Sequence, residues 1–420
     1  DKIIKKAVEE GVSTDEISER YIAAFAEDTK GFNVLEPTTR PRATREIGGM
    51  VEMIGELIDK GHAYARNGHV YFKTRSFRDY GKLSKKNIDD LESGARIAVN
   101  EDKDDPLDFV LWKPKKEGEP SWETPWSDGR PGWHIECSVM SRKYLGDQID
   151  IHAGGEDLIF PHHENEIAQT ESCTGKDFSH YWMHNAFINV DGSKMSKSLG
   201  NFFLVREVTA HYEPAVLRFF LLSVHYRMPI NFSSEIMDSN KNALERIRNA
   251  VSRLDALAGN KGVDVSDLKA DLYEADGTYK GGITLSHEGL DGAEAETAAE
   301  FDALRTKFDE VMEDDFNTAD AITAVFEMVK LANTKVTEDS SAGLVRYALA
   351  SIGLLAGILG LEIRGREETI DSEIEEMINK RQEARKNKDF KTADEIRAKL
   401  LEMGIVLEDT REGVKWKRTT

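Results

Sequence analysis

The sequence contains three side chains that can serve together as metal ligands, Cys137, His162 and Glu166. The last two also have the spacing that two ligands of one ion need. Cys137 lies about 25 residues before Pro161, which can open a helix at its first position and is followed by His162 and Glu166. On such a helix, residues four apart project from one face, as two ligands of one ion must. A thiolate, an imidazole and a carboxylate together suit zinc. The alternative is structural, with a small buried cysteine and a histidine on a polar helix surface.

A short segment of lysines and hydroxyls is the second feature that could carry chemistry. The dipeptide Asp191-Gly192 is typical of a hairpin turn. The segment that follows it consists of Lys194, Met195, Ser196, Lys197 and Ser198. Two lysines with hydroxyls on a short mobile loop can hold a polyphosphate and neutralise the charge that develops when its α-phosphorus is attacked. Lysine and serine loops are also common as solvated surface, which is the alternative.

The elements that must position these residues follow from hydrophobic periodicity. Apolar residues at helical spacing predict helices within the first 42 residues and around Met50–Ile58. Short strands are predicted at His69–Phe72 and at Ile149–Ile151. Strands and helices therefore alternate in the part of the chain that carries both chemical features.

The second half of the chain is predicted to be mainly helical beyond about residue 240. Thr318 is the expected N-cap of one helix, and the acidic, weakly periodic segment 264–300 indicates a solvated loop or an insertion. Two short helices are predicted around Ile374–Arg385 and Ala393–Leu401. Alternating apolar residues in Ile405–Trp416 then predict a terminal hairpin.

The charge balance bears on which partners the protein can bind and on the salt concentration that it tolerates. Net charge is −21, with 77 Asp and Glu against 56 Lys and Arg, which would ordinarily argue against a nucleic-acid partner because phosphate binding rests on cations. This objection is not decisive. At molar salt the Debye length falls to about 3 Å and carboxylates keep a surface hydrated, so we interpret the acidity as that of an extreme halophile. An ordinary acidic protein is the alternative. The one basic stretch runs from Lys380 to the end, with 12 Lys and Arg against 8 Asp and Glu.

Cysteine content and hydropathy predict a cytoplasmic protein without a membrane partner. Cys137 and Cys173 are the two cysteines and form no disulfide framework, and the first residues lack the apolar core of a signal peptide. The most apolar window, Tyr347–Leu361, is shorter than the roughly 18 residues of a membrane span. We interpret this window as a buried helix, and Cys173 as a structural thiol near a helix end.

The lysine and serine segment is the K-M-S-K-S signature of class I aminoacyl-tRNA synthetases, and the chain resembles the cysteinyl-tRNA synthetases over almost its whole length. The segments that carry this resemblance are Phe109–Lys113, Gly129–Ser138, His152–Gln169 and Asp314–Thr318. The resemblance implies an α/β fold, in which a class I Rossmann-like catalytic domain with an insertion precedes a mainly α-helical bundle and a small α/β C-terminal unit.

The resemblance also divides the chain into domains. The implied parts are the remainder of the first catalytic half (1–42), a connective insertion (43–128), the second catalytic half with the signature loop (129–200), a connecting segment (201–240), the helical bundle (241–366, with the acidic insertion near 264–300) and the anticodon-binding unit (367–420).

A zinc site is the most specific implication of the resemblance. In that family one zinc ion per chain is held by two cysteines, a histidine and a glutamate, and Cys137, His162 and Glu166 match three of these ligands. The family's other cysteine lies near its H-I-G-H motif, which binds ATP, and neither is found here. The resemblance therefore predicts that about 70 residues, on the scale of two βαβ units, are missing before Asp1 and that this chain alone is inactive.

The implied reaction is attack of the cysteine carboxylate on ATP, with Mg²⁺, followed by transfer of the cysteinyl group to tRNA(Cys). Lys194 and Lys197 are the implied catalytic residues, placed at the phosphates. Trp133, His152 and Asp157 are implied to line the cysteine pocket. Apolar contacts would separate cysteine from serine by only about 1–3 kcal/mol, whereas zinc rewards a thiolate that a hydroxyl cannot imitate.

The tail is implied to read the anticodon. Unpaired bases stack on aromatic rings and offer their edges to Arg and Asp, so the predicted contacts are Arg385, Phe390, Asp394 and Asp409. Each of these residues has a structural alternative, such as Phe390 anchoring a small core.

Two rival functions stay open. One is a cysteine ligase of the mycothiol pathway, which would lack an anticodon-reading tail, and the other is a non-catalytic tRNA-binding fragment. The sequence does not predict the oligomeric state.

Overall fold

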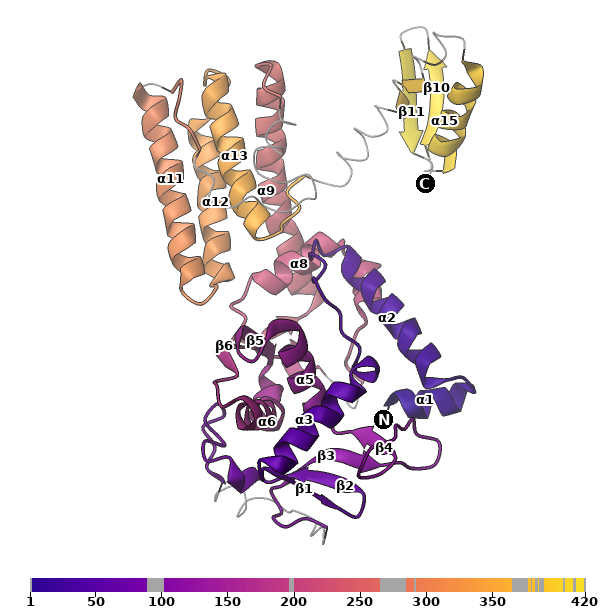
Figure 1. The fold of residues 1–420 in the computed structure, drawn as a ribbon. Helices are drawn as coiled ribbons and strands as arrows, with labels where there is room; N and C mark the ends of the chain where they lie inside the picture. The colour runs from indigo at the N-terminus through magenta and orange to yellow at the C-terminus, as the bar shows by residue number, and fades with distance from the viewer. Residues whose placement is uncertain are drawn as a thin grey trace. The chain divides into compact units, whose positions relative to one another are not determined.

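The structure is a computed structural model of the 420-residue chain. It describes residues 2–88, 102–195, 200–264, 285–290, 292–364, 377–378, 380–381, 384, 389–402, 405–410 and 413–418. The chain divides into two compact units, Asp1–Met237 and Asp238–Thr420 (Figure 1). Within the described part, no helix combines the length and the apolarity that crossing a membrane requires.

The first unit mixes helices with short strands. Its main elements are α1 (Lys2–Glu10), α2 (Thr14–Lys30), α3 (Ile47–Asp59), β1 (Ala63–Arg66), β2 (His69–Phe72), β3 (Phe109–Pro114), β4 (Gly129–Pro131), α5 (Trp133–Leu145), β5 (Ile149–Gly155), α6 (Glu164–Thr174), β6 (Ser179–Asn185), β7 (Ile188–Val190), β8 (Ser193–Lys194), α7 (Val205–Thr209), α8 (Pro214–Leu222) and β9 (Ile230–Phe232). The helices predicted within the first 42 residues are confirmed as α1 and α2. Ser13 and Glu16 form a capping box that starts α2.

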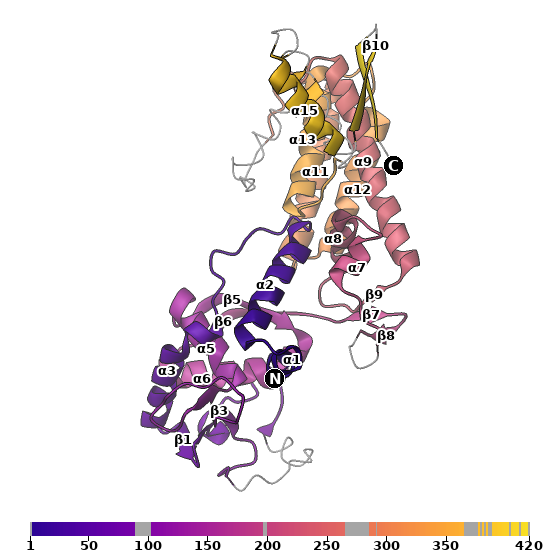
Figure 2. The ribbon, with the colours of Figure 1, turned by 90° about the vertical axis from the view of Figure 1, so that its right-hand side faces the viewer.

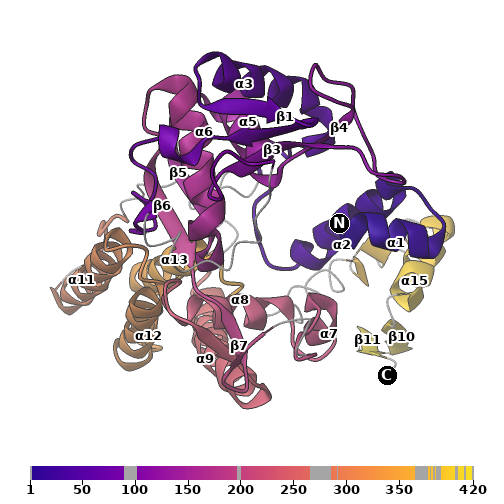
Figure 3. The same cartoon turned by 90° about the horizontal axis from the view of Figure 1, so that it is seen from below.

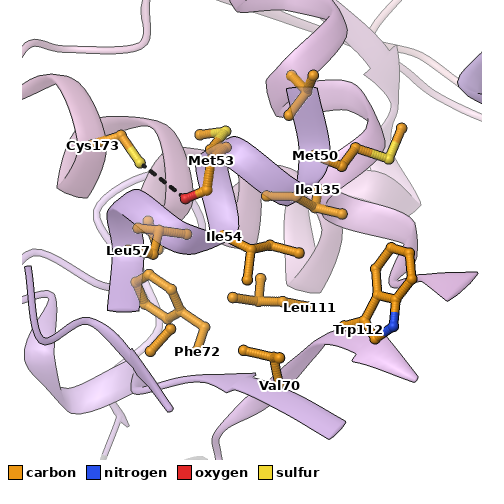
Figure 4. Close-up of a cluster of buried hydrophobic side chains, with 13 residues drawn as sticks. Met50, Met53, Ile54, Leu57, Val70, Phe72, Leu111, Trp112, Ile135 and Cys173 are labelled. Atoms are coloured by element: carbon orange, nitrogen blue, oxygen red, sulfur yellow. Dashed lines mark hydrogen bonds between the residues drawn. The ribbon is translucent and has the colours of Figure 1, made fainter. Parts of the chain in front are cut away.

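An antiparallel sheet of order β1-β2-β3-β4 and three helices enclose the core of the first unit. Figure 3 shows α3, α5 and α6 beside this sheet. The side chains that fill the core are at most 2% exposed and come from α3, the sheet and α5: Met50, Met53, Ile54, Leu57, Val70, Phe72, Leu111, Trp112 and Ile135 (Figure 4). Their spacing along α3 is helical, so the helix predicted at Met50–Ile58 and the strand predicted at His69–Phe72 are both confirmed.

Cys173 belongs to this core rather than to a chemical site. It is buried one residue before the end of α6, and its Sγ lies 3.9 Å from the Met53 carbonyl oxygen (Figure 4). Burial raises the pKa of the Cys173 thiol to about 12, so the unreactive thiol form persists at neutral pH. The predicted structural thiol near a helix end is confirmed.

A parallel pair of strands, β5 and β6, borders α6. The pairing runs from Ile149 opposite Ser179 to Gly155 opposite Asn185. The strand predicted at Ile149–Ile151 is therefore shorter than β5. Pairing with β6 extends β5 to Gly154 and Gly155, although glycine has a low intrinsic preference for strands. A Cβ at Gly154 would lie 2.8 Å from the His163 ring, so glycine is needed there for that ring to approach.

The predicted hairpin before the lysine segment is confirmed as β7 and β8. Asp191 and Gly192 connect the strands with φ of 48° and 77°, which is the left-handed conformation that a type I′ turn requires. β9 pairs in parallel with β7, and Figure 2 shows the three strands side by side. The sheet of order β8-β7-β9 thus supports the start of the lysine segment.

The second unit begins with helices. Its main described elements are α9 (Ser234–Asn260, which starts in the first unit), α11 (Gly292–Glu313), α12 (Thr318–Lys335), α13 (Ala342–Ile358), α15 (Phe390–Glu402), β10 (Ile405–Thr410) and β11 (Gly413–Arg418). The buried helix predicted at Tyr347–Leu361 is confirmed within α13, whose residues are largely buried. The terminal hairpin is confirmed by the antiparallel pairing of β10 and β11.

Two predictions for this unit were wrong in detail. The N-cap of α12 is Asn317, whose side chain accepts from the Asp320 backbone N–H, and Thr318 is the first helical residue, because asparagine is the stronger cap. The acidic segment 264–300 is not all loop, since α11 starts at Gly292 with an alanine-rich stretch of high helix propensity. The helix predicted at Ala393–Leu401 corresponds to α15, whereas most of Ile374–Arg385 lies outside the described residues.

Candidate active site

The first turn of α5 carries two of the predicted site residues. Gly132 is its N-cap, and a Cβ there would lie 2.2 Å from the Val110 carbonyl oxygen. Only glycine therefore lets the start of α5 pass this close to β3. Trp133 opens the helix, and Cys137 lies four residues later on the same face.

The other two predicted ligands lie where α6 begins. Ile159–His163 forms a π-helical turn that is interrupted at Phe160, which is extended. The helix predicted from Pro161 thus starts as a π turn and continues as α6. His162 Nε2 still lies 2.7 Å from Glu166 Oε1, so the predicted four-residue spacing on one face is confirmed.

Cys137, His162 and Glu166 form a cluster whose ligand atoms all lie within 4.8 Å of one another, with His162 and Glu166 buried and Cys137 half-buried. The Glu166 oxygens lie 2.7 Å from His162 Nε2 and 3.1 Å from His152 Nε2. Apart from these two histidine contacts, the buried Glu166 oxygens have no hydrogen-bond partner among the described residues. A thiol, an imidazole and a carboxylate that lie this close together have the arrangement of ligands around a common ion.

The electrostatics of the cluster also fit a cation. Burial, together with the charges of Glu166 and Glu136, raises the pKa of the Cys137 thiol to about 12. Burial by itself would raise the pKa of Glu166, but the adjacent His152 and His162 lower it to about 2. The Glu166 carboxylate is ionised at neutral pH and the neighbouring Cys137 thiol is not, and a divalent metal ion would favour the ionised form of both groups.

Three further histidines surround this cluster and were missed in the sequence analysis. His134 Nδ1 lies 2.8 Å from His162 Nδ1, and His163 Nδ1 lies 2.8 Å from His184 Nε2. Burial lowers the pKa of His134 and of His163 to about 4, so both rings are neutral at neutral pH. His134 precedes Cys137 by three residues on one helix face, a spacing that could have identified it. His163 and His184 have no such signal.

A second potential ligand group shares one carboxylate with the first. The ligand atoms of His152, His163 and Glu166 also lie within 4.8 Å of one another. Because Glu166 belongs to both groups, its two oxygens face two different sets of ring nitrogens. The site is therefore a continuous histidine cluster around one buried glutamate.

The residues predicted to bind cysteine lie at different distances from this cluster. Trp133 is 60% exposed, and its ring centroid is 4.2 Å from that of His162. His152 contacts Glu166, as described above, from β5. Asp157 is exposed on the turn after β5, where its Oδ1 would lie 2.6 Å from a Cβ at Gly155. The structure thus brings Trp133 and His152 to the cluster and Asp157 to the neighbouring strand end.

The lysine segment begins at an exposed hairpin strand. Lys194 lies on β8 with its Nζ 3.2 Å from the centroid of the Phe187 ring. The Met195 backbone N–H donates to the Ile188 carbonyl at 3.0 Å, which ties the start of the segment to β7. Ser196, Lys197 and Ser198 lie outside the described residues.

The predicted anticodon contacts lie in the last part of the chain. Phe390 and Asp394 are on α15, and Asp409 is on β10 opposite Val414. Arg385 lies outside the described residues.

Comparison with known proteins first defines the class of this chain. The family model for the class I (C) catalytic domain of tRNA synthetases matches residues 1–242. The structure resembles that of a Mycobacterium tuberculosis methionyl-tRNA synthetase with methionyl-adenylate, at a TM-score of 0.56, 16% identity and coverage of 86% of this chain and 81% of that one. A putative arginyl-tRNA synthetase from Campylobacter jejuni gives a TM-score of 0.55, 14% identity and coverage of 84% and 69%. The predicted class I Rossmann-like fold is thereby confirmed.

Close relatives then define the family. The cysteine–tRNA ligase of Lachnoclostridium phytofermentans is 65% identical over 100% of this chain and 85% of its own length, and that of Clostridioides difficile is 50% identical with the same coverage. The DALR domain matches residues 307–364, and the cysteinyl-tRNA ligase anticodon binding domain matches residues 368–416. The chain belongs to the cysteine–tRNA ligase family of class I aminoacyl-tRNA synthetases. The halophilic source gains no support from these relatives and, like the finer domain boundaries, stays a prediction.

Proposed function

We propose that this protein activates cysteine with ATP and Mg²⁺ and transfers the cysteinyl group to tRNA(Cys). The observation that carries the proposal is the close cluster of Cys137, His162 and Glu166, in a chain whose relatives, 49% to 65% identical over its whole length, are named cysteine–tRNA ligases. The test is cysteine-dependent exchange of pyrophosphate into ATP by protein expressed from the complete coding sequence. Serine is the control amino acid, and equal exchange with both would contradict the proposal.

Zinc is the metal that this cluster fits best. Cys137 would contribute its thiolate, His162 its Nε2 and Glu166 one carboxylate oxygen, a soft and borderline ligand set that selects zinc over magnesium or calcium. When bound, zinc would supply a Lewis acid that favours the substrate thiolate over a hydroxyl. The chain's own residues hold these ligand atoms close together, and the burial of His162 and Glu166 limits access of competing water to them.

Trp133, His152 and Asp157 are proposed to enclose the substrate beside this cluster. The exposed Trp133 ring lies against His162 and offers an apolar face next to the ligands. His152, on β5, lies against Glu166. Asp157 is a carboxylate two residues after Gly155. Such a carboxylate can pair with the α-amino group of an amino acid, while the ring and the imidazole confine its side chain.

The lysine segment is proposed to hold the triphosphate. Lys194 is exposed at the end of a hairpin, and the segment continues through Met195, Ser196, Lys197 and Ser198. Their ammonium and hydroxyl groups would neutralise charge on the α-phosphorus and on the leaving pyrophosphate. Lys194 and Lys197 are therefore the proposed catalytic residues.

The C-terminal part is proposed to read the anticodon through Arg385, Phe390, Asp394 and Asp409. The match of residues 368–416 to an anticodon-binding family supports this proposal. It also disfavours a cysteine ligase that acts on an amino sugar, because such an enzyme has no anticodon to read. A non-catalytic tRNA-binding fragment would bind tRNA(Cys) but give no pyrophosphate exchange.

A further inference from the structure

The two ring nitrogens of His162 have different surroundings. Nε2 lies 2.7 Å from Glu166 Oε1, and His162 forms a potential ligand group with Glu166 and Cys137, so Nε2 is the nitrogen on the side of the candidate metal position. Nδ1 points away from that position and lies 2.8 Å from Nδ1 of His134. At this separation the two nitrogens share a single proton, so one ring donates a hydrogen bond and the other accepts it.

Metal binding decides which ring is the donor. A histidine binds a metal through an unprotonated nitrogen, and the hydrogen bond of the other nitrogen fixes the tautomer. If Nε2 of His162 is the ligand atom, the ring proton must lie on Nδ1. His162 Nδ1–H then donates to His134 Nδ1, which has to be the unprotonated nitrogen of its own ring.

The position of His134 is itself fixed by packing. Its ring meets the Phe109 ring edge-on, at a centroid distance of 5.8 Å and an interplanar angle of 86°. It stacks on the Trp133 ring at 5.8 Å and 26°. Because α5 holds His134 and the turn Ile159–His163 before α6 holds His162, the hydrogen bond between them joins the two segments that carry candidate ligands.

We propose that His134 is a positioning residue for the metal site, which accepts the hydrogen bond of His162 Nδ1–H and so presents Nε2 to the ion. This inference rests on the proposed metal site and goes beyond it, because His134 is not itself a ligand. This role requires a hydrogen-bond acceptor at the position of His134 Nδ1, and it does not require an aromatic ring. An asparagine amide oxygen occupies nearly the same place, whereas phenylalanine keeps the ring packing and removes the acceptor.

The test compares zinc affinity in His134→Phe, His134→Asn and the unchanged protein by competition with a chromogenic chelator. We expect a loss of about 10–100-fold for His134→Phe, the scale for outer-shell partners of metal ligands, and less than about threefold for His134→Asn. The matched control is His62→Phe, which removes a histidine that lies 2.8 Å from Ser76 Oγ and belongs to neither potential ligand group. The absorption spectrum of the Co²⁺-loaded protein should change in His134→Phe alone.

The outcomes separate this inference from the metal proposal. Unchanged zinc binding in both His162→Ala and His134→Phe would refute the metal site itself. Zinc lost in His162→Ala but retained at full affinity in His134→Phe would overturn only the role of His134. Equal weakening in His134→Asn and His134→Phe would also overturn it, because the acceptor would then not matter.

A measurement on the unchanged protein covers the case in which His134→Phe does not fold. Imidazole nitrogen NMR of the zinc-loaded protein should show His162 protonated at Nδ1, with that proton protected from exchange by its hydrogen bond. A His162 ring protonated at Nε2 in the loaded protein would overturn the inference.

Discussion

The candidate metal cluster and the lysine segment are held by opposite kinds of structure. Cys137 comes from α5, His162 from the π-helical turn before α6 and Glu166 from α6 itself, and Glu166 has no exposed surface. Lys194 lies at the end of a two-residue strand and is exposed, with its Nζ over the Phe187 ring. Both regions belong to the first unit, so the difference lies in local packing.

This difference matches what each region has to recognise. Choosing a thiol over a hydroxyl requires ligand atoms fixed to within a few tenths of an ångström, which buried side chains on helices provide. Holding a triphosphate requires several cations that close around a large, highly charged group, and an exposed hairpin end is accessible to such a group. Changes at the cluster should therefore act on metal binding, and changes at the lysine segment on the chemical step.

The largest expected effect is the loss of metal from a double substitution in the cluster. Protein with Cys137→Ala and His162→Ala keeps only Glu166 of the three described ligands, so zinc content should fall from about one ion per chain to near zero. Elemental analysis after gel filtration measures this content. The control is Cys173→Ala, which removes a buried thiol of the core and should leave the metal in place. Full zinc content in the double variant would show that Cys137 and His162 do not bind the metal, and the contrast between the metal cluster and the lysine segment would then fail.

The next effect concerns the lysine segment. Lys197→Ala should slow cysteine-dependent pyrophosphate exchange by roughly 10²–10³-fold, the scale of one lost transition-state donor, while zinc content and tRNA affinity change little. Lys115→Ala, which removes an exposed lysine paired with Asp128 at 2.7 Å, should leave exchange unchanged. If Lys197→Ala lowers tRNA affinity and spares exchange, the lysine belongs to tRNA binding instead.

Local patterns in the sequence predicted the elements but only part of the site. Periodicity located α3 and β2, and the Asp191-Gly192 pair located the turn, because these features depend on neighbouring residues. The contact of His134 with His162 joins residues 28 positions apart, and that of His163 with His184 joins residues 21 apart. Such contacts depend on how helices and strands pack, which a single sequence does not encode locally. The start of α12 shows a smaller limit of sequence analysis. Asn317 and Thr318 are adjacent and both residue types can cap a helix, so the pattern alone does not select between them.

A smaller effect is expected from removing the proposed anticodon reader. Deleting residues 368–420 should leave pyrophosphate exchange and zinc content intact and raise the KM for tRNA(Cys). Base stacking contributes about 1–3 kcal/mol per base, so discrimination against anticodon variants should fall by that amount for each base contacted. Aminoacylation of tRNA(Cys) transcripts with single anticodon changes measures the loss. Unchanged discrimination after the deletion would assign anticodon reading to another part of the chain.

The smallest effect is expected from a substitution that weakens the packing of α6 but changes none of the candidate ligands. Glu164 is fully buried at the start of α6, and its two oxygens accept from the backbone N–H groups of Gly81 and Ser84, both at 2.8 Å. In Glu164→Gln one acceptor becomes an NH₂ group that faces a backbone donor, which leaves that donor unsatisfied and costs about 1–3 kcal/mol.

We therefore expect Glu164→Gln to lower the thermal unfolding midpoint of the metal-free protein by a few degrees, since about 1 kcal/mol corresponds to roughly 2–4 °C in a domain of 150–250 residues. Glu52→Gln, at an exposed position on α3, is the matched control and should leave the midpoint unchanged. Zinc affinity should change less than in His134→Phe, because the hydrogen bonds of Glu164 reach the loop at Gly81 and Ser84 and not a ligand. If Glu164→Gln weakens zinc binding as strongly as His134→Phe, the fixed geometry of the cluster depends on the packing of α6 as a whole, and no single outer histidine sets it.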